Sequence, residues 1–228
     1  MAHSTFHTTH WSVVLAAKGD DTKARAALAE LCKSYREPIV RHIERAIRTD
    51  SASRYGGRSA EDLTHDFLIQ LLEGKLFELF QRREGRFRAY ILQAVRYFLS
   101  HVREQELSAK RGGKFAHVPI DGDIAMPHED TLFDRDWAQT TINRAIVSLG
   151  NTQEIQMLRS WLTSEMTAED RLRLATELGK SEGAIKVALH RLRKKLRQHI
   201  REQIAHTVET EAEIGAELDY LIRVLVQH

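Results

Sequence analysis

The chain has 228 residues, of which 42% are hydrophobic and 29% are charged, and its net charge is only +2. With three prolines and twelve glycines, this composition excludes a collagen-like or disordered chain and is typical of a globular protein with a core. No apolar run approaches the roughly 18–20 residues of a membrane-spanning helix, and the lone Cys32 cannot form an internal disulfide, so we expect a cytoplasmic protein.

Apolar residues recur at helical spacing and no alternating strand pattern stands out, which predicts an all-α fold. The first helical block runs from Trp11 to about Ile47, and Pro38 is expected to interrupt it. After a break at 54–57, Ser59 with an acid three residues later indicates the start of a helix that reaches Leu72.

A long helix is predicted from about Phe87 to Glu106, and it ends in the basic, glycine-containing segment 110–114. Residues 114–130 contain two prolines and several acids without a helical period, so we interpret them as a linker. The predicted architecture is two small helical domains, 1–113 and 131–206, followed by an acidic amphipathic helix at 207–228.

In the second domain, a helix stopped by Gly150 and a helix around 155–162 precede two more helices with clear boundaries. Thr167 with Asp170 indicates the start of a helix that ends at Leu178, and Gly179 suits the left-handed conformation that follows a helix. Ser181 then caps a helix that reaches at least Arg197. Two helices joined by such a turn predict a helix-turn-helix, whose second helix enters the DNA major groove.

The near-neutral total charge hides a basic segment between acidic ones. No acid occurs from Lys186 to Arg201, where seven cations fall, whereas 121–136 and 202–219 are acid-rich. We expect the outward residues near the start of this helix to meet base edges and the later cations to contact phosphates. The predicted base contacts are Ser181, Glu182, Lys186 and His190, and the predicted phosphate contacts are Arg191, Arg193, Lys194 and Arg197.

These residues carry a resemblance to a known family. TELGKSEGAIKVALHRLRKKLR (176–197) resembles the DNA-binding region 4 of extracytoplasmic-function (ECF) RNA polymerase sigma factors. EDLTHDFLIQL (61–71) and GRFRAYIL (85–92) are similar to region 2 of the same family. The set of motifs along the chain resembles most the ECF-like group that is abundant in planctomycetes. The resemblance implies a factor that binds core RNA polymerase and directs transcription initiation at specific promoters.

The resemblance also implies roles for the first domain. Binding to core polymerase would fall to Glu61, Asp62, Asp66 and Gln70 on one helix. Contact with the melted −10 strand would need cations that follow its backbone and an aromatic wall for an unstacked base. The candidates are Arg86, Arg88, Arg96, Tyr97, His101, Arg103, Lys110 and Arg111. Thr64 stands where the family usually has valine and is a candidate phosphorylation site.

Further partners to consider are an anti-sigma factor and a Ser/Thr kinase. No catalytic motif or cofactor fingerprint occurs, and His3, His7 and His10 have no acid or cysteine nearby to complete a metal site, so an enzyme is not expected and no cofactor or metal is implied. Two alternatives stay open: a helix-turn-helix regulator that never joins the polymerase, and a helical adaptor whose C-terminal segment binds a partner. That segment could also fold back over the basic helix and inhibit it.

Overall fold

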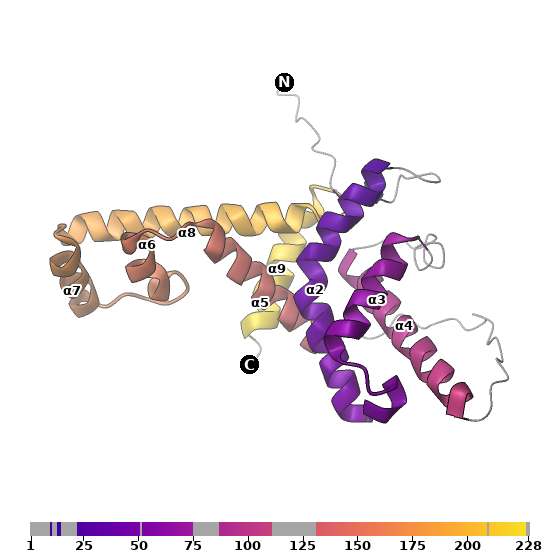
Figure 1. Cartoon of the computed structure of the whole chain (residues 1–228). Coiled ribbons are helices and arrows are strands. Elements are labelled where there is room, and N and C mark those ends of the chain that lie inside the picture. Colours follow the sequence, from indigo (N-terminus) through magenta and orange to yellow (C-terminus); the bar gives the residue numbers. More distant parts are fainter. Residues whose placement is uncertain are drawn as a thin grey trace, which may run out of the picture. The chain divides into compact units, whose positions relative to one another are not determined.

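The computed structural model describes residues 10, 13–14, 22–50, 52–74, 87–110, 131–208 and 210–226 (Figure 1). Within these ranges all regular secondary structure is helical, which confirms the predicted all-α fold. The predicted linker and the segment 75–86 lie outside the described residues.

The described residues form two compact units. The first unit contains the residues up to Thr140 and those from Ala205 onward, and the second contains Thr141–Ile204. In this division the C-terminal segment groups with the N-terminal helices, and the domain bounds 1–113 and 131–206 stay predictions.

Three helices make up most of the first unit: α2 (Thr22–Asp50), α3 (Ala60–Leu72) and α4 (Phe87–Lys110). A short 3₁₀ helix, η1 (Ala52–Tyr55), follows α2, and α3 returns alongside α2 (Figure 1). The expected interruption at Pro38 was wrong, because α2 runs through it without a break. Proline lacks the N–H that a helix interior uses, but Tyr35, Ile39 and Ile43 around it are fully buried, so packing holds the helix together.

Aromatic rings join these helices into one core. Tyr35 of α2 meets Phe87 of α4 edge to face at 5.0 Å between ring centroids, and Phe67 of α3 meets Phe98 of α4 at 5.6 Å. All four side chains are buried. Edge-to-face pairs add to the stabilisation that apolar burial supplies, so these contacts fix α3 and α4 relative to α2.

A buried charge network attaches the C-terminal helix α9 (Glu213–Val226) to the same unit. Arg88 of α4 forms ion pairs with Asp134 of α5 (Thr131–Ser148) and with Glu217 of α9. Its guanidinium also lies 4.2 Å from the ring centroid of Tyr220, whose hydroxyl donates to Asp134. Burial acts to lower the pKa of Arg88, but Glu217 and Asp134 outweigh it and raise that pKa, so the side chain stays charged.

The position of α9 bears on the self-inhibition hypothesis. Its buried face consists of Ile214, Glu217, Tyr220, Leu221 and Val224. Because Glu217 and Tyr220 on this face bind α4 and α5, the apolar side of α9 is already used inside the first unit. These contacts give α9 a structural role in the first unit, and self-inhibition stays a hypothesis.

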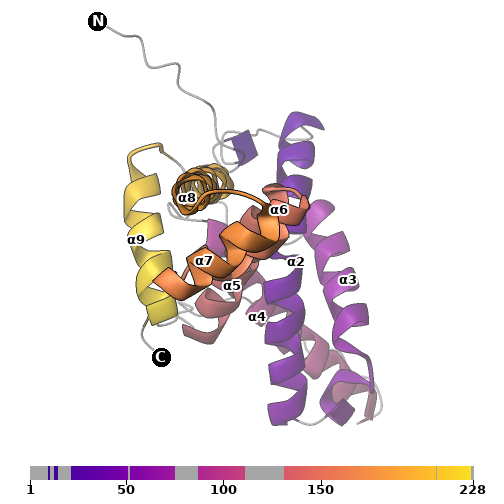
Figure 2. The ribbon, with the colours of Figure 1, turned by 90° about the vertical axis from the view of Figure 1, so that its left-hand side faces the viewer.

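The second unit consists of the end of α5 and of α6 (Gln153–Leu158), α7 (Ala168–Leu178) and most of α8 (Glu182–Ala205). A 3₁₀ turn, η2 (Arg159–Trp161), extends α6. Figure 2 looks along α8 and shows α7 running obliquely below it. The core of this unit is aliphatic, with buried residues from all four helices: Ala145, Leu158, Leu162, Leu174, Ala175, Ile185, Leu189, Leu192 and Leu196.

Candidate nucleic-acid interface

Reciprocal capping sets the start of α7. The backbone N–H of Asp170 donates to Thr167 Oγ1 at 3.1 Å, and the Asp170 carboxylate accepts from the Thr167 backbone N–H at 3.4 Å and from its hydroxyl at 2.7 Å. These bonds satisfy donors that a helix start leaves unpaired. The hydrogen bond from Thr167 lowers the pKa of Asp170 below its ordinary value, so the cap is strongest with the carboxylate ionised. The capping pattern predicted from the sequence is thereby confirmed.

The turn into α8 depends on one glycine. Gly179 has φ of +62° and ψ of +35°, the left-handed conformation that costs glycine least. Lys180 N–H donates to Ala175 O at 2.9 Å and Gly179 N–H to Thr176 O at 3.3 Å, a pairing that closes a helix end tightly. Ser181 Oγ then accepts from Ala184 N–H at 3.2 Å and caps α8. The geometry of the turn is thus set by two backbone hydrogen bonds and by the Ser181 side chain.

Burial divides α8 into two faces. Ile185, Leu189, Leu192 and Leu196 point into the core of the second unit. Between Lys186 and Arg201 the opposite face is exposed and carries six cations with no acid among them: Lys186, Arg191, Lys194, Lys195, Arg197 and Arg201. The imidazole of His190 lies on the same exposed face. A rigid helix with an outer face of one charge is suited to a polyanion such as a nucleic-acid backbone.

Arg193 has another role than the predicted phosphate contact. Its guanidinium donates to Trp161 O at 2.8 Å and to Ser164 O at 2.6 Å. These carbonyls lie at and just after η2, where no helical N–H follows to satisfy them. Arg193 therefore holds the segment between α6 and α7 against α8, and its donors are largely used within the chain.

Two ion pairs fix the ends of the turn. Lys180 Nζ lies 2.8 Å from Glu154 Oε1 of α6, and Arg171 Nε of α7 lies 2.9 Å from Glu182 Oε2 of α8. Arg171 is a residue that sequence reasoning missed. Its partner is 11 residues away across the turn, and helical periodicity gives no signal for such a pair.

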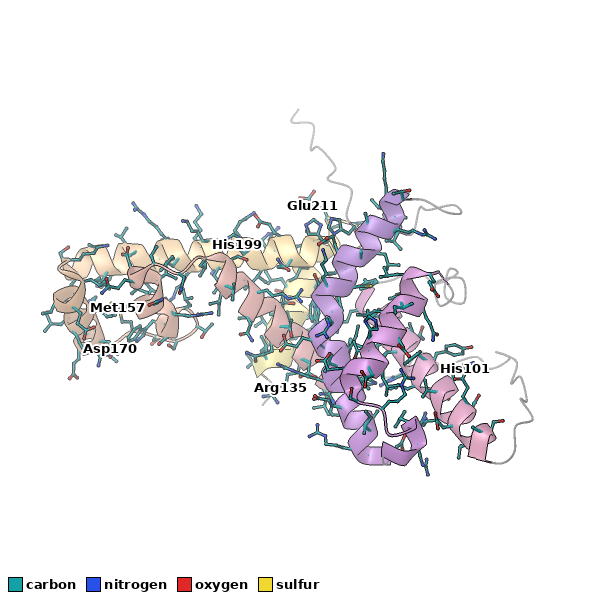
Figure 3. All side chains as sticks on the ribbon, in the orientation of Figure 1. His101, Arg135, Met157, Asp170, His199 and Glu211 are labelled. Carbon is teal, nitrogen blue, oxygen red and sulfur yellow. The ribbon has the colours of Figure 1, made fainter. Side chains whose placement is uncertain are left out.

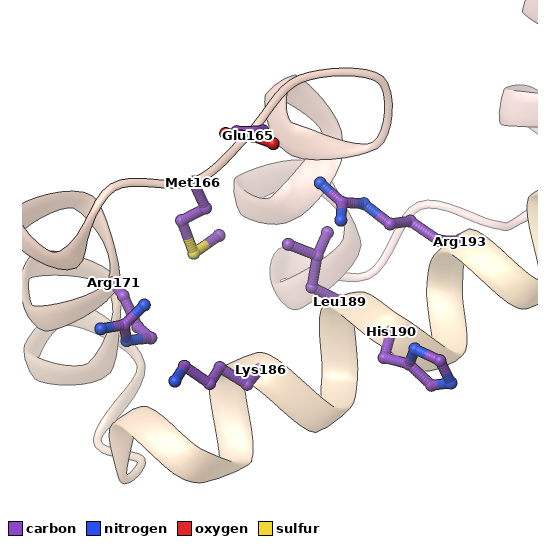
Figure 4. Close-up of a pocket in the computed structure, with 7 residues that line it drawn as sticks. All are labelled: Glu165, Met166, Arg171, Lys186, Leu189, His190 and Arg193. Atoms are coloured by element: carbon purple, nitrogen blue, oxygen red, sulfur yellow. The ribbon is translucent and has the colours of Figure 1, made fainter.

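A hollow of about 320 Å³ lies between α7 and α8 on this side of the second unit (Figure 4). Arg171 and Lys186 approach one end of it, and Arg193 extends past Leu189 toward the loop that carries Glu165. The predicted base contacts do not share one flank of α8: Lys186 and His190 line this hollow, whereas Ser181 lines a second hollow with Lys180 and Arg191.

The structure divides the candidate −10 residues into three groups. Arg88 is only 8% exposed and bound in the charge network, so the expectation that it contacts DNA is corrected. On α4, Arg96, Tyr97 and Arg103 are partly exposed and His101 is exposed, and the rings of Tyr97 and His101 stack with centroids 6.0 Å apart. Figure 3 shows His101 on the outer side of α4. Arg86, Arg111 and the side chain of Lys110 lie outside the described residues.

Arg103 is partly committed to the fold. Its Nη1 lies 2.6 Å from Asp50 Oδ2, and the Tyr55 hydroxyl donates to the same carboxylate at 2.9 Å. Hydrogen bonds from Tyr55 and Arg103 lower the pKa of Asp50. Gly56 beside them has φ of +66°, a backbone conformation that favours glycine, and a Cβ there would also displace the Glu106 carboxylate, whose Oε1 lies 2.6 Å away.

The candidate polymerase-binding acids lie on the outer side of α3. Glu61 pairs with Arg36 at 2.5 Å and Asp66 pairs with Arg58, while Gln70 is half-exposed. Asp62 forms the capping box of α3 with Ser59, and this hydrogen bond lowers its pKa. All four predicted residues thus share one helix, although three of them also bind groups of their own chain.

Thr64 is buried, unlike the four candidate polymerase-binding residues on α3. Its side chain is 1% exposed, and within the described part of the chain its Oγ1 has no hydrogen-bond partner. A kinase needs an accessible hydroxyl, and this one faces the core between Leu63 and Phe67 of α3. In this conformation Thr64 occupies the space of an apolar residue.

The described residues contain no group of three or more His, Cys, Asp or Glu side chains arranged for a metal ion. Cys32 is buried, and burial raises the pKa of its thiol to about 12, so it is not a reactive thiolate. Among the helices that are described, none combines the length and apolarity that crossing a bilayer requires. Of the His3, His7 and His10 set in the sequence, only His10 is described, and its ring stacks on that of His206.

Comparison with known proteins agrees with this geometry. A family model described as ECF sigma factor matches residues 12–202, which include α2–α7 and most of α8. No curated protein and no solved structure gives a match to the chain. The chain therefore belongs to the ECF sigma factor family, whose members are transcription initiation factors and not enzymes.

Proposed function

We propose that this chain binds core RNA polymerase and directs it to specific promoters, with α8 in the major groove of the −35 element. The observation that carries the proposal is the exposed face of α8 between Lys186 and Arg201, which carries six cations and no acid on a helix whose start is fixed by the Gly179 turn. A helix of this diameter fits the major groove of B-form DNA. Family membership supports the same role.

On this proposal, the position of each cation along α8 decides whether it contacts base edges or phosphates. Lys186 and His190 lie near the start of the helix and approach base edges, while Arg191, Lys194, Lys195, Arg197 and Arg201 follow phosphates. Arg193 shapes the interface from inside, since it binds the carbonyls of Trp161 and Ser164. Each phosphate contact releases condensed counterions, so affinity falls steeply as salt rises.

The first unit supplies contacts to the polymerase and to the melted strand. The stacked Tyr97 and His101 rings on α4 offer a platform for an unpaired base, which contributes on the order of 1–3 kcal/mol per base. Arg96 lies next to this platform. Glu61, Asp66 and Gln70 on α3 would face a basic surface of core polymerase. Exposed pairs such as Glu61–Arg36 contribute little to stability, so a partner's cations can replace them.

Run-off transcription with reconstituted holoenzyme tests both surfaces. Lys186→Glu places an acid on the DNA face of α8, and Asp66→Arg places a cation on the polymerase face of α3. Lys33→Glu on α2 and Asp219→Arg on α9 are the matched charge reversals at exposed positions outside both surfaces. We expect the first two variants to lose promoter-directed transcripts and the two controls to keep them.

Binding to core polymerase, measured apart from transcription, distinguishes the roles of the two surfaces. Lys186→Glu should still bind core polymerase, whereas Asp66→Arg should not. If the chain binds DNA but never directs core polymerase, the regulator hypothesis replaces this one. An anti-sigma factor or a Ser/Thr kinase stays a candidate partner, but phosphorylation of Thr64 is not part of the proposal because that hydroxyl is buried.

A further inference from the structure

One acid stands within the otherwise cationic outer surface at the start of α8. Glu182 is in the first helical turn, and its side chain is 46% exposed. Arg171 of α7 donates to its Oε2 at 2.9 Å and is itself only 19% exposed. The arginine lies in the hollow between α7 and α8, where Lys186 and Met166 also contribute to the wall (Figure 4). A largely buried arginine thus holds an exposed carboxylate.

An unpaired carboxylate at this position would oppose DNA binding, because it would approach phosphates with the same charge. Arg171 compensates that charge and also restricts the rotamers of Glu182. The pair engages Oε2, so Oε1 is the acceptor that can meet a base edge. A carboxylate only accepts hydrogen bonds, and it therefore pairs with a base that presents a donor in the major groove.

Cytosine is the base that this arrangement fits best. Its N4 amino group is a donor in the major groove, whereas guanine presents acceptors and thymine presents an acceptor with a methyl group. Adenine also has a donor, but its N7 acceptor lies beside it and would repel a carboxylate.

We propose that Arg171 is a positioning residue that holds Glu182 to accept a hydrogen bond from cytosine N4, which makes the upstream element selective for cytosine at one position. This inference rests on the proposed function, since it requires α8 to lie in the major groove. Arg171 itself acts through Glu182 and touches no base.

The test uses holoenzyme reconstituted from the full chain and core polymerase, with a promoter library randomised across the upstream element. Sequencing of the transcribed templates gives the base preference at each position. We expect about a tenfold preference for cytosine at one position in the wild type. Glu182→Ala should abolish that preference and Arg171→Met should weaken it several-fold, with the other positions unchanged. Arg173→Met removes the same charge from an exposed site on α7 and should leave the preference intact.

A charge exchange sharpens the result. In the Arg171→Glu, Glu182→Arg double variant the ion pair is restored with its charges reversed, and an arginine now stands at the reading position. Arginine pairs with guanine, so the preference should shift from cytosine to guanine. If the ion pair had a purely structural role, the double variant would lower transcription from all templates equally and would not shift the base preference.

Two results would overturn the inference while leaving the proposed function intact. One is that the Glu182→Ala holoenzyme selects the same upstream motif as the wild type. The other is the same base preference in Arg171→Met and Arg173→Met. If the wild-type holoenzyme selects no upstream motif at all, the proposed function fails, and this inference fails with it.

Discussion

The buried charge network around Arg88 makes a quantitative test of the fold. Arg88→Met keeps most of the apolar stem of the side chain but removes the guanidinium. Asp134 and Glu217 would then be buried carboxylates without their cation, and the Tyr220 ring would lose the charge that lies 4.2 Å from its centroid. Both α5 and α9 would lose their polar attachment to α4.

Removal of one partner from a buried ion pair costs about 3–5 kcal/mol. For a chain of this size, each kcal/mol lowers the melting temperature by roughly 2–4 °C, so the expected decrease is about 6–20 °C. Arg36→Met is the matched control, because Arg36 and its partner Glu61 are both more than half exposed. That change should cost less than about 1 kcal/mol.

Thermal and urea unfolding followed by circular dichroism measure the difference. The triple variant Arg88→Met, Asp134→Asn, Glu217→Gln removes the stranded charges and should regain part of the lost stability. Equal stability losses in Arg88→Met and Arg36→Met would refute the reasoning, because the buried network would then contribute no more than a surface pair.

Three other predictions follow from single features. Thr64→Val removes a buried hydroxyl without a hydrogen-bond partner in the described part of the chain. It should raise the free energy of unfolding, measured by urea denaturation, by about 1 kcal/mol or more. A loss of stability would show that the hydroxyl has a hydrogen-bond partner. Because the pKa of Asp170 is lowered, its cap stabilises α7 fully at pH values above the ordinary aspartate pKa of 3.8 and loses this effect as pH falls through the lowered pKa. The difference in the free energy of unfolding between wild type and Asp170→Asn should therefore close in acid. A difference that persists in acid would contradict this. Deletion of residues 213–228 should destabilise the first unit and lower transcription, whereas increased DNA binding by a well-folded truncated chain would support the self-inhibition hypothesis.

Local sequence signals predicted the helices well because the interactions behind them are local. The capping pairs Ser59–Asp62 and Thr167–Asp170 span three residues, and Gly179 marks a left-handed turn that few other residues adopt without strain. The inward register of α8 follows from helical periodicity alone. These features needed no knowledge of the tertiary structure.

Arg88 and Arg193 show where sequence reasoning failed. The sequence predicts DNA contacts for both because each lies among other cations. Arg88 instead meets Glu217, 129 residues away, and Arg193 meets the carbonyl of Trp161, 32 residues away. Such partners come together only through tertiary packing, and the same applies to Arg171 with Glu182 and to the docking of α9.

On the proposed function, this chain converts core RNA polymerase into a promoter-specific enzyme. The most direct test mixes the chain with bacterial core polymerase and fragmented genomic DNA and maps the 5′ ends of the transcripts by sequencing. The account predicts discrete start sites that require the chain, share an upstream element and disappear with Lys186→Glu. Transcripts that start at the same places without the chain, or no transcripts despite tight DNA binding, would contradict it.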